Sequence, residues 1–201
     1  LALTDCTLAS LSNLAQYYLT SGNIPPRLGN AHSTIVPYEC FETADRHIVI
    51  AVGNDSQFVR LCKVLSKDEW TADARFQTNQ NRVKNRGILL PMIRDTLKTR
   101  TGEEWLSLFR EYDIPSSLVQ NIAEAFNSEQ IKSRDMQIKV NHSKTKRGIK
   151  LVGSPIKLSA TPVDFTKSPP VCGEDTVKIL QSLLSLSEED IQNYMKKKVI
   201  G

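Results

Sequence analysis

The sequence predicts a mixed α/β protein. Apolar residues recur at helical spacing in several segments, such as residues 1–21 and 55–65. Short runs rich in β-branched and other apolar residues are typical of strands, as in residues 47–52 and 136–140. The composition, with 40% hydrophobic and 24% charged residues, is that of a globular protein with a buried core.

Composition and charge argue against several classes of protein. No window approaches the roughly 18 consecutive apolar residues that a membrane-spanning helix needs, so we expect no membrane partner. The net charge of +4 is modest and the two signs are interspersed, so we expect no nucleic-acid partner. The 4 cysteines lie far apart without a CxxC pair, which argues against a zinc site and fits reduced thiols.

The first elements are a helix and a β-hairpin. Residues 1–21 carry a broad apolar stripe, and Gly22 is a typical helix end. Residues 22–37, rich in Gly, Pro and Asn, predict a loop. Residues 38–43 and 47–52 predict the two arms of a hairpin, and the second arm is apolar on both faces, as in a buried strand.

Helices dominate the middle of the chain. Asp55 is a suitable N-cap for a helix that continues to residue 65. Residues 86–99 predict another helix, in which Pro91 favours a kink or a later start. The run Thr101–Glu104 has the spacing of a capping box and predicts a third helix.

The last part of the chain alternates again. Asn121–Glu124 repeats the capping spacing, and residues 136–140 and 149–158 predict a second hairpin. Residues 159–170 predict a linker. A final helix is expected to begin at Ser187, because acidic residues follow at its start and lysines at its end, as the helix dipole favours.

The segment Gly53–Gln57 is the most informative local feature. It lies between a buried strand and a helix, where a glycine allows close approach of a ligand and free N–H groups favour an anion or carbonyl oxygen. The pattern is neither a Walker loop nor a dinucleotide-binding fingerprint, because the required glycines and lysine are missing. From the residues alone, a ligand-contacting loop and a plain structural turn both stay open.

Other candidates are weaker. His32 lies in a predicted loop and is either functional or a surface histidine bonded to the backbone. Two basic groups, between Arg82 and Arg100 and between Lys139 and Lys150, fit either a phosphate-rich ligand or a solvated face. The sequence holds no Ser/His/Asp order. It also holds no HExxH motif, and we expect no metal site.

Nine stretches in order carry a resemblance to a known family. They are RLGNAH, VPYECFETAD, IVIAVGNDSQFVRLC, ARFQTNQNRVKNR, EEWLSLF, IPSSLV, EQIKSRDM, VGSPIKLSATP and CGEDT. Through them the chain resembles the class III CoA-transferases, which include formyl-CoA transferase and L-carnitine CoA-transferase. The VGNDSQF and RLGNAH forms are most similar to the succinyl-CoA:glutarate-type branch, which uses dicarboxylates. The resemblance covers essentially the whole chain and implies the C-terminal half of such a protein.

The resemblance implies an architecture. Residues 35–160 would form a small α/β domain flanked by segments of a Rossmann-like large domain. Residues 1–34 would end that large domain and link it to the small one, and residues 161–201 would return to it. The full-length protein would be an interlocked homodimer. The family branch implies a mitochondrial location, with a cytoplasmic one as the alternative.

The resemblance also implies an activity. The enzyme would move CoA from an acyl-CoA, expected to be succinyl-CoA, to a small carboxylate through an aspartyl intermediate. Coenzyme A esters would be substrates, and no cofactor is expected. The nucleophilic aspartate is expected upstream of Leu1, because Asp5 matches a different family position. We therefore assign no catalytic residue here and expect this chain alone to be inactive.

The same resemblance assigns site residues. The family's glycine-containing loop over the active site matches Gly53–Gln57, and Asn30, His32 and Tyr38 match motif positions near the domain junction. The expected contacts to substrate or CoA are therefore Gly53, Asn54, Asp55, Gln57, Asn30, His32 and Tyr38. Three departures from the family pattern leave substrate preference open. Asp45-Arg46 replaces an Asp-Gly turn, Ile114–Leu118 replaces a Val-Pro-x-Gly-Pro stretch, and a proline, Pro91, lies inside a helix.

Two alternatives remain. An acyl-CoA racemase of the same superfamily would abstract a proton next to the thioester carbonyl, although the GNDSQF loop argues against it. A truncated, non-catalytic protein would only bind CoA esters or a partner subunit, and the expected absence of an upstream half motivates this alternative.

Overall fold

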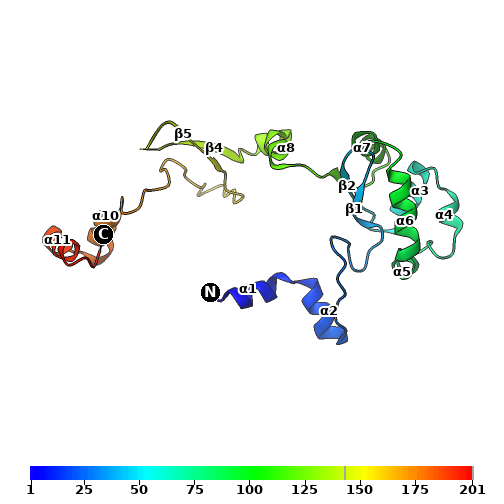
Figure 1. Ribbon diagram of the computed structural model, residues 1–201, viewed down its shortest axis with the longest axis horizontal. Coiled ribbons are helices and arrows are strands. Elements are labelled where there is room, and N and C mark those ends of the chain that lie inside the picture. The colour runs from blue at the N-terminus through cyan, green and yellow to red at the C-terminus, as the bar shows by residue number, and fades with distance from the viewer. Residues whose placement is uncertain (143, 201) are drawn as a thin grey trace. The chain divides into compact units, whose positions relative to one another are not determined.

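The computed structural model describes residues 1–142 and 144–200, without the side chain of residue 146. The chain is mixed α/β, as the sequence predicted, and divides into two units, Leu1–Val119 and Gln120–Gly201 (Figure 1). This division falls inside the range 35–160 that the resemblance gives to a small domain. The boundaries expected after residues 34 and 160 stay predictions.

The first unit is built on a three-stranded antiparallel sheet in the order β1-β2-β3. β1 (Tyr38–Glu42) and β2 (His47–Ala51) form the predicted hairpin. β3 (Ser116–Leu118), which was not predicted, lies in the stretch that departs from the family pattern and pairs with the free edge of β2. Because β2 is the central strand, its Ile48 and Ile50 are completely buried.

The chain between β2 and β3 is helical. Its helices are α3 (Asp55–Val64), α4 (Glu69–Ala72), α5 (Asn79–Lys84), α6 (Arg86–Leu97) and α7 (Gly102–Glu111). α6 contacts β1, and α7 contacts β2, β3 and α3 (Figure 1). Phe58, Trp105 and Phe109 project from α3 and α7 into the core between the helices and the sheet. The predicted capping box at Thr101 begins α7.

α6 continues through Pro91. It begins at Arg86, so of the two expected outcomes the later start was wrong, and the kink stays a prediction. Pro91 has no N–H group, and the carbonyl that would have accepted that bond belongs to Gly87, four residues earlier. Gly87 is exposed, so water can solvate this carbonyl, and the helix tolerates the proline.

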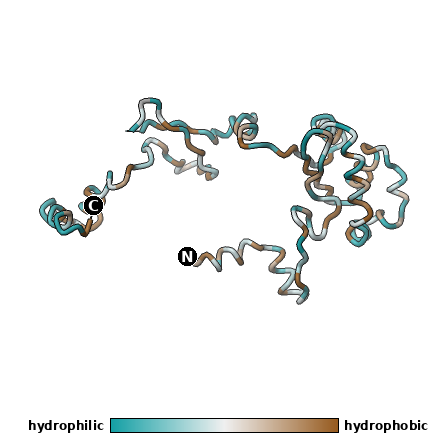
Figure 2. The backbone as a smooth tube through the Cα atoms, in the orientation of Figure 1, coloured by the Kyte–Doolittle hydropathy of each residue, from teal (hydrophilic) through white to brown (hydrophobic). Residues whose placement is uncertain are grey.

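The predicted single helix over residues 1–21 is two helices. α1 (Leu3–Ser10) and α2 (Asn13–Ser21) are separated at Ser12, whose φ of 47° lies in the left-handed region and ends a right-handed helix. Gly22 ends α2 with a φ of 71°, as predicted. Neither helix buries a residue, and Figure 2 shows apolar stretches along both of them.

The second unit holds the predicted second hairpin and final helix. Its elements are α8 (Ile122–Asn127), α9 (Glu129–Ser133), β4 (Gln137–His142), β5 (Thr145–Val152), α10 (Thr176–Leu184) and α11 (Glu188–Lys196). The capping box at Asn121 and the N-cap at Ser187 are confirmed. β5 ends at Val152 instead of reaching residue 158, because Pro155 has no N–H group to donate to a strand ladder. α10 was not predicted.

Arg82 is the largest fully buried side chain of the core, with no exposed surface. Its Nε donates to the carbonyl of Val36 at 2.7 Å, and its Nη1 donates to the carbonyl of Phe76 at 2.9 Å. The guanidinium lies over the ring of Phe58, 4.4 Å from the ring centre, and its Nη2 forms an ion pair with Asp55 at 2.9 Å. Burial lowers the pKa of Arg82, and the Asp55 carboxylate opposes that shift.

Replacing Arg82 with Met is expected to lower the free energy of unfolding by about 3 kcal/mol, because the carbonyls of Val36 and Phe76 would stay buried without donors. Chemical denaturation measures the loss. Arg75→Met is the matched control, since Arg75 pairs with Asp73 at 2.6 Å on the surface and should contribute less than about 1 kcal/mol. Equal losses in the two variants would contradict the assignment.

The turn between β1 and β2 is bonded to the start of α7. Residues 43–46 form this turn, which is longer than a two-residue type I′ turn. The Asp45 carboxylate accepts hydrogen bonds from the backbone N–H of Gly102 at 2.7 Å and from the Thr43 hydroxyl at 3.0 Å. These bonds, the one from Gly102 first, hold the pKa of Asp45 below its ordinary value of 3.8.

Acid is expected to destabilise the first unit partly through Asp45. Because the folded-state pKa is lowered, the carboxylate stabilises the fold above about pH 4, and this contribution disappears as the pH falls through the folded-state pKa. Asp45→Asn should therefore be less stable than wild type near neutral pH and show a flatter loss of stability in acid. A pH series of thermal unfolding midpoints measures this, with Glu103→Gln on the exposed face of α7 as control. An acid slope identical to that of wild type would rule out this role.

Candidate functional site

The segment Gly53–Gln57 forms a closed turn that leads from β2 into α3. Asn54, and not Asp55 as predicted, is the N-cap of α3, since its Oδ1 accepts from the N–H of Gln57 at 2.9 Å and from the Ser56 hydroxyl at 2.8 Å. The Gln57 side chain in turn accepts the N–H of Gly53 at 2.7 Å. The turn is therefore fixed by its own side chains, although residues 53–56 are exposed.

This turn presents unpaired backbone donors. Within the part of the chain that the structure describes, nothing accepts from the N–H groups of Asp55 and Ser56 at the start of α3. Helix N-termini with such free N–H groups attract anionic or carbonyl oxygens. The fold itself does not require Gly53, because an added Cβ would only reach ordinary contact with Gln57 at 3.5 Å. The geometry thus fits a loop that a ligand approaches closely.

A second group of predicted residues gathers around the loop before β1. The Asn30 Oδ1 accepts the N–H of Cys40 at 3.0 Å, and the His32 N–H donates to the carbonyl of Tyr38 at 2.9 Å. The rings of His32 and Tyr38 are stacked, with centroids 5.2 Å apart. The His32 Nδ1 accepts the N–H of Thr34 at 3.2 Å, so the neutral imidazole carries its proton on Nε2.

Asn30, His32 and Tyr38 share one hollow in the surface. It has a volume of about 340 Å³, and its other lining residues are Asn13, Leu14, Pro26, Leu28, Gly29, Ala31 and Ser33. The residues of the Gly53–Gln57 turn do not line this hollow. The structure therefore brings the predicted residues into two groups, one in the hollow and one in the turn.

α5 connects these two groups. The Asp55 Oδ1 accepts from the N–H of Asn79 at 2.8 Å and pairs with Arg82 Nη2 at 2.9 Å. The side chain of Asn79 donates to the carbonyl of Thr34 at 2.8 Å and accepts the N–H of Val36 at 3.1 Å. The Asp55 carboxylate is thus occupied within the protein, which explains why it does not cap α3.

Sequence reasoning missed Asn79 and misplaced Arg82. The sequence placed Arg82 in a basic group that fitted a phosphate-rich ligand or a solvated face. Arg82 is completely buried, so both interpretations were wrong for this residue. The signal that could have revealed the pair is their spacing of three residues, which puts them on one face of a helix. Neighbouring members of the basic group are also engaged: Arg86 donates to the carbonyl of His32 at 3.1 Å, and Arg94 pairs with the buried Glu39.

The described residues offer no metal site, and the buried thiol of Cys62 is not activated. No group of three or more His, Cys, Asp or Glu side chains among them could hold a metal ion. Burial raises the pKa of Cys62 to about 12, so its thiol stays protonated near neutral pH. Across the same residues, no helix has the length and apolar character to cross a bilayer.

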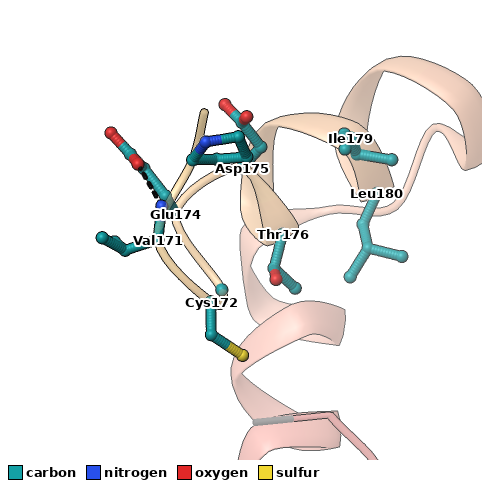
Figure 3. A pocket seen from close by; sticks show the side chains of 9 residues that line it. Val171, Cys172, Glu174, Asp175, Thr176, Ile179 and Leu180 are labelled. Atoms are coloured by element: carbon teal, nitrogen blue, oxygen red, sulfur yellow. Dashed lines mark hydrogen bonds between the residues drawn. The ribbon is translucent and has the colours of Figure 1, made fainter. Parts of the chain in front are cut away.

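A larger hollow lies in the second unit, at the start of α10 (Figure 3). Its volume is about 470 Å³, and Pro170–Thr176, Ile179 and Leu180 line it. None of the predicted site residues lies there. The Glu174 carboxylate, the dashed contact in Figure 3, accepts the N–H of Val171 at 2.8 Å and closes the turn that forms one wall. The Glu174 carboxylate therefore serves the local turn.

This chain is similar to known proteins along most of its length. It is 31% identical to the succinyl-CoA:glutarate CoA-transferase of Mus musculus over 98% of this chain and 46% of that protein. It is 35% identical to the succinate–glutarate CoA-transferase of Agrobacterium fabrum over 91% of this chain and 46% of that protein. The crystal structure of a CAIB/BAIF family protein from Brucella suis superimposes with a TM-score of 0.72 at 32% identity, covering 89% of this chain and 46% of that one.

The chain spans about half the length of the relatives it matches. The model of CoA-transferase family III matches residues 1–176, which include both groups of candidate residues and the α5 contacts between them. The chain therefore belongs to CoA-transferase family III.

Proposed function

We propose that this chain is part of an enzyme that moves CoA from an acyl-CoA, namely succinyl-CoA, to a small dicarboxylate. The observation that carries the proposal is the family match over residues 1–176. Its relatives in mouse and Agrobacterium, named for succinate and glutarate, support the choice of donor and acceptor. A relative in Haloarcula hispanica is named for succinyl-CoA and mesaconate, which supports a dicarboxylate acceptor more generally.

The reaction proceeds through an aspartyl intermediate. The aspartate carboxylate attacks the thioester carbonyl of succinyl-CoA, which forms a mixed anhydride and releases CoA thiolate. The thiolate attacks the aspartyl carbonyl of that anhydride, which releases succinate and leaves an aspartyl-CoA thioester. The acceptor carboxylate then displaces the thiolate, and the thiolate attacks the acceptor's carbonyl in the new anhydride. This last step gives the new acyl-CoA and restores the aspartate.

The nucleophilic aspartate lies in polypeptide upstream of Leu1. Support comes from the coverage, since the chain accounts for only 46% of the mouse relative. It also comes from the candidate site, where Asp55 is already bound to Asn79 and Arg82. The Asp55 oxygen that makes both contacts is therefore engaged within the protein.

The described loops bind and shield the substrate. The free N–H groups of Asp55 and Ser56 suit a carbonyl or carboxylate oxygen, and Gly53 allows the chain to approach it closely. Excluding water matters, because it would hydrolyse either anhydride. Contacts from Asn54, Gln57, Asn30, His32 and Tyr38 complete this binding role in our proposal.

The proposal includes the state of the whole protein. It is an interlocked homodimer located in mitochondria, and coenzyme A esters are its substrates without a bound cofactor. The succinyl-CoA:glutarate CoA-transferases of Mus musculus and Homo sapiens support the family branch from which we infer this location. Mass measurement of the whole protein in solution and imaging of a tagged copy test the two statements.

The direct test incubates the whole protein with succinyl-CoA and a panel of dicarboxylates that includes glutarate. Mass spectrometry should detect the new acyl-CoA and free succinate in equal amounts, together with a trapped protein-bound CoA thioester. The 201-residue chain alone should give no turnover, because it lacks the nucleophile. Turnover by this chain alone would refute the upstream position.

A parallel measurement separates the racemase alternative. In deuterated water a racemase incorporates deuterium next to the thioester carbonyl, whereas CoA transfer leaves that carbon unlabelled. Deuterium incorporation without CoA exchange would replace the transferase proposal. Binding of succinyl-CoA without either reaction in the whole protein would favour the non-catalytic alternative.

A further inference from the structure

Two side chains of α5 join the two groups of candidate residues, and we call Asn79 and Arg82 the α5 clasp. Asn79 bonds to Thr34 and Val36, in the segment that connects His32 to Tyr38. Arg82 bonds to the carbonyl of Val36 at 2.7 Å. On the other side, the backbone of Asn79 and the guanidinium of Arg82 both hold Asp55 in the Gly53–Gln57 turn.

The clasp determines how the two segments lie relative to each other. The strand pairing puts Tyr38 opposite Ala51, and the N–H of Val52 donates to the carbonyl of Pro37 at 3.0 Å. Among the described residues, no backbone hydrogen bond joins residues 32–36 to residues 53–57. The contacts between residues 32–36 and 53–57 pass through α5 side chains.

Burial restricts the side chain of Arg82 in the clasp. Arg82 is completely buried, and its planar guanidinium directs two N–H donors in fixed directions to backbone carbonyls, while its Nη2 lies 2.9 Å from the Asp55 carboxylate as an ion pair. The Asp55 carboxylate is the charge that compensates this buried cation. The same Asp55 oxygen also accepts from the backbone N–H of Asn79, so Asp55 anchors the turn to α5.

We propose that Asn79 and Arg82 are positioning residues that set the distance between the Gly53–Gln57 turn and the His32–Tyr38 segment, and thereby the affinity for the acyl-CoA. The proposal rests on the function proposed above, because it assumes that both segments contact one substrate. It assigns the substrate contacts of the turn to its backbone and to Asn54 and Gln57.

Asn79→Asp is the most selective variant. It keeps the size of the side chain and the oxygen that accepts the N–H of Val36, but it replaces the NH₂ group that donates to Thr34 with an oxygen that repels the carbonyl. Asn81→Asp is the matched control. Asn81 lies on the same helix, and its side chain donates to the carbonyl of Ala74 at 2.8 Å, outside both segments.

Both variants are made in the whole protein and measured in two ways. Hydrogen exchange of the amides in residues 32–38 and 53–57 should become about tenfold faster in Asn79→Asp and stay unchanged in Asn81→Asp. With succinyl-CoA as the substrate, KM should rise about tenfold in Asn79→Asp while kcat changes less than about threefold. A merely structural role of α5 would affect the two variants alike.

The two measurements separate the two proposals. If the wild-type protein exchanges no CoA, the proposed function fails, while hydrogen exchange still decides whether the clasp holds both segments. Equal exchange in the two variants would overturn the clasp. Faster exchange in Asn79→Asp with KM unchanged would overturn its role in substrate affinity.

Discussion

The buried guanidinium of Arg82 is the constraint on which the candidate site depends. A cation without solvent contact must find its partners inside the protein, and here they are two backbone carbonyls and the carboxylate of Asp55. Each partner belongs to a different segment, so satisfying one side chain fixes the approach to β1, the loop between α4 and α5, and the start of α3. The packing of Phe58 beneath the guanidinium ties the same contact to the hydrophobic core.

Within the short Gly53–Gln57 turn, the groups that hold the structure together differ from the groups that remain free. Asn54 and Gln57 shape the turn from inside, and Asp55 anchors it to α5. The backbone N–H groups of Asp55 and Ser56 and the side-chain NH₂ groups of Asn54 and Gln57 have no acceptor among the described residues. In a family whose members transfer CoA between carboxylic acids, such a surface suits uncharged or anionic oxygens better than a free carboxylate would, because it does not repel them.

The apolar surfaces of the chain are distributed unevenly. Helices α3, α6 and α7 bury large apolar side chains against the sheet, whereas α1, α2 and α10 bury none. Figure 2 shows apolar stretches in both kinds of helix. Exposed apolar side chains that gather along a helix are typical of surfaces that another part of a protein or assembly covers. The chain's share of about half of its relatives' length agrees with that expectation.

The sequence by itself determined the elements whose signals are local. Both hairpins, the capping boxes at Thr101 and Asn121, and the N-cap at Ser187 follow from neighbouring residues, because caps and turns are made within a few positions. Spaced motifs likewise gave the family. Only the tertiary structure decided that β3 joins the sheet and that Arg82 is a core residue. Those outcomes depend on partners far along the chain, such as Val36, which lies 46 residues before Arg82, and local spacing carries no information about them.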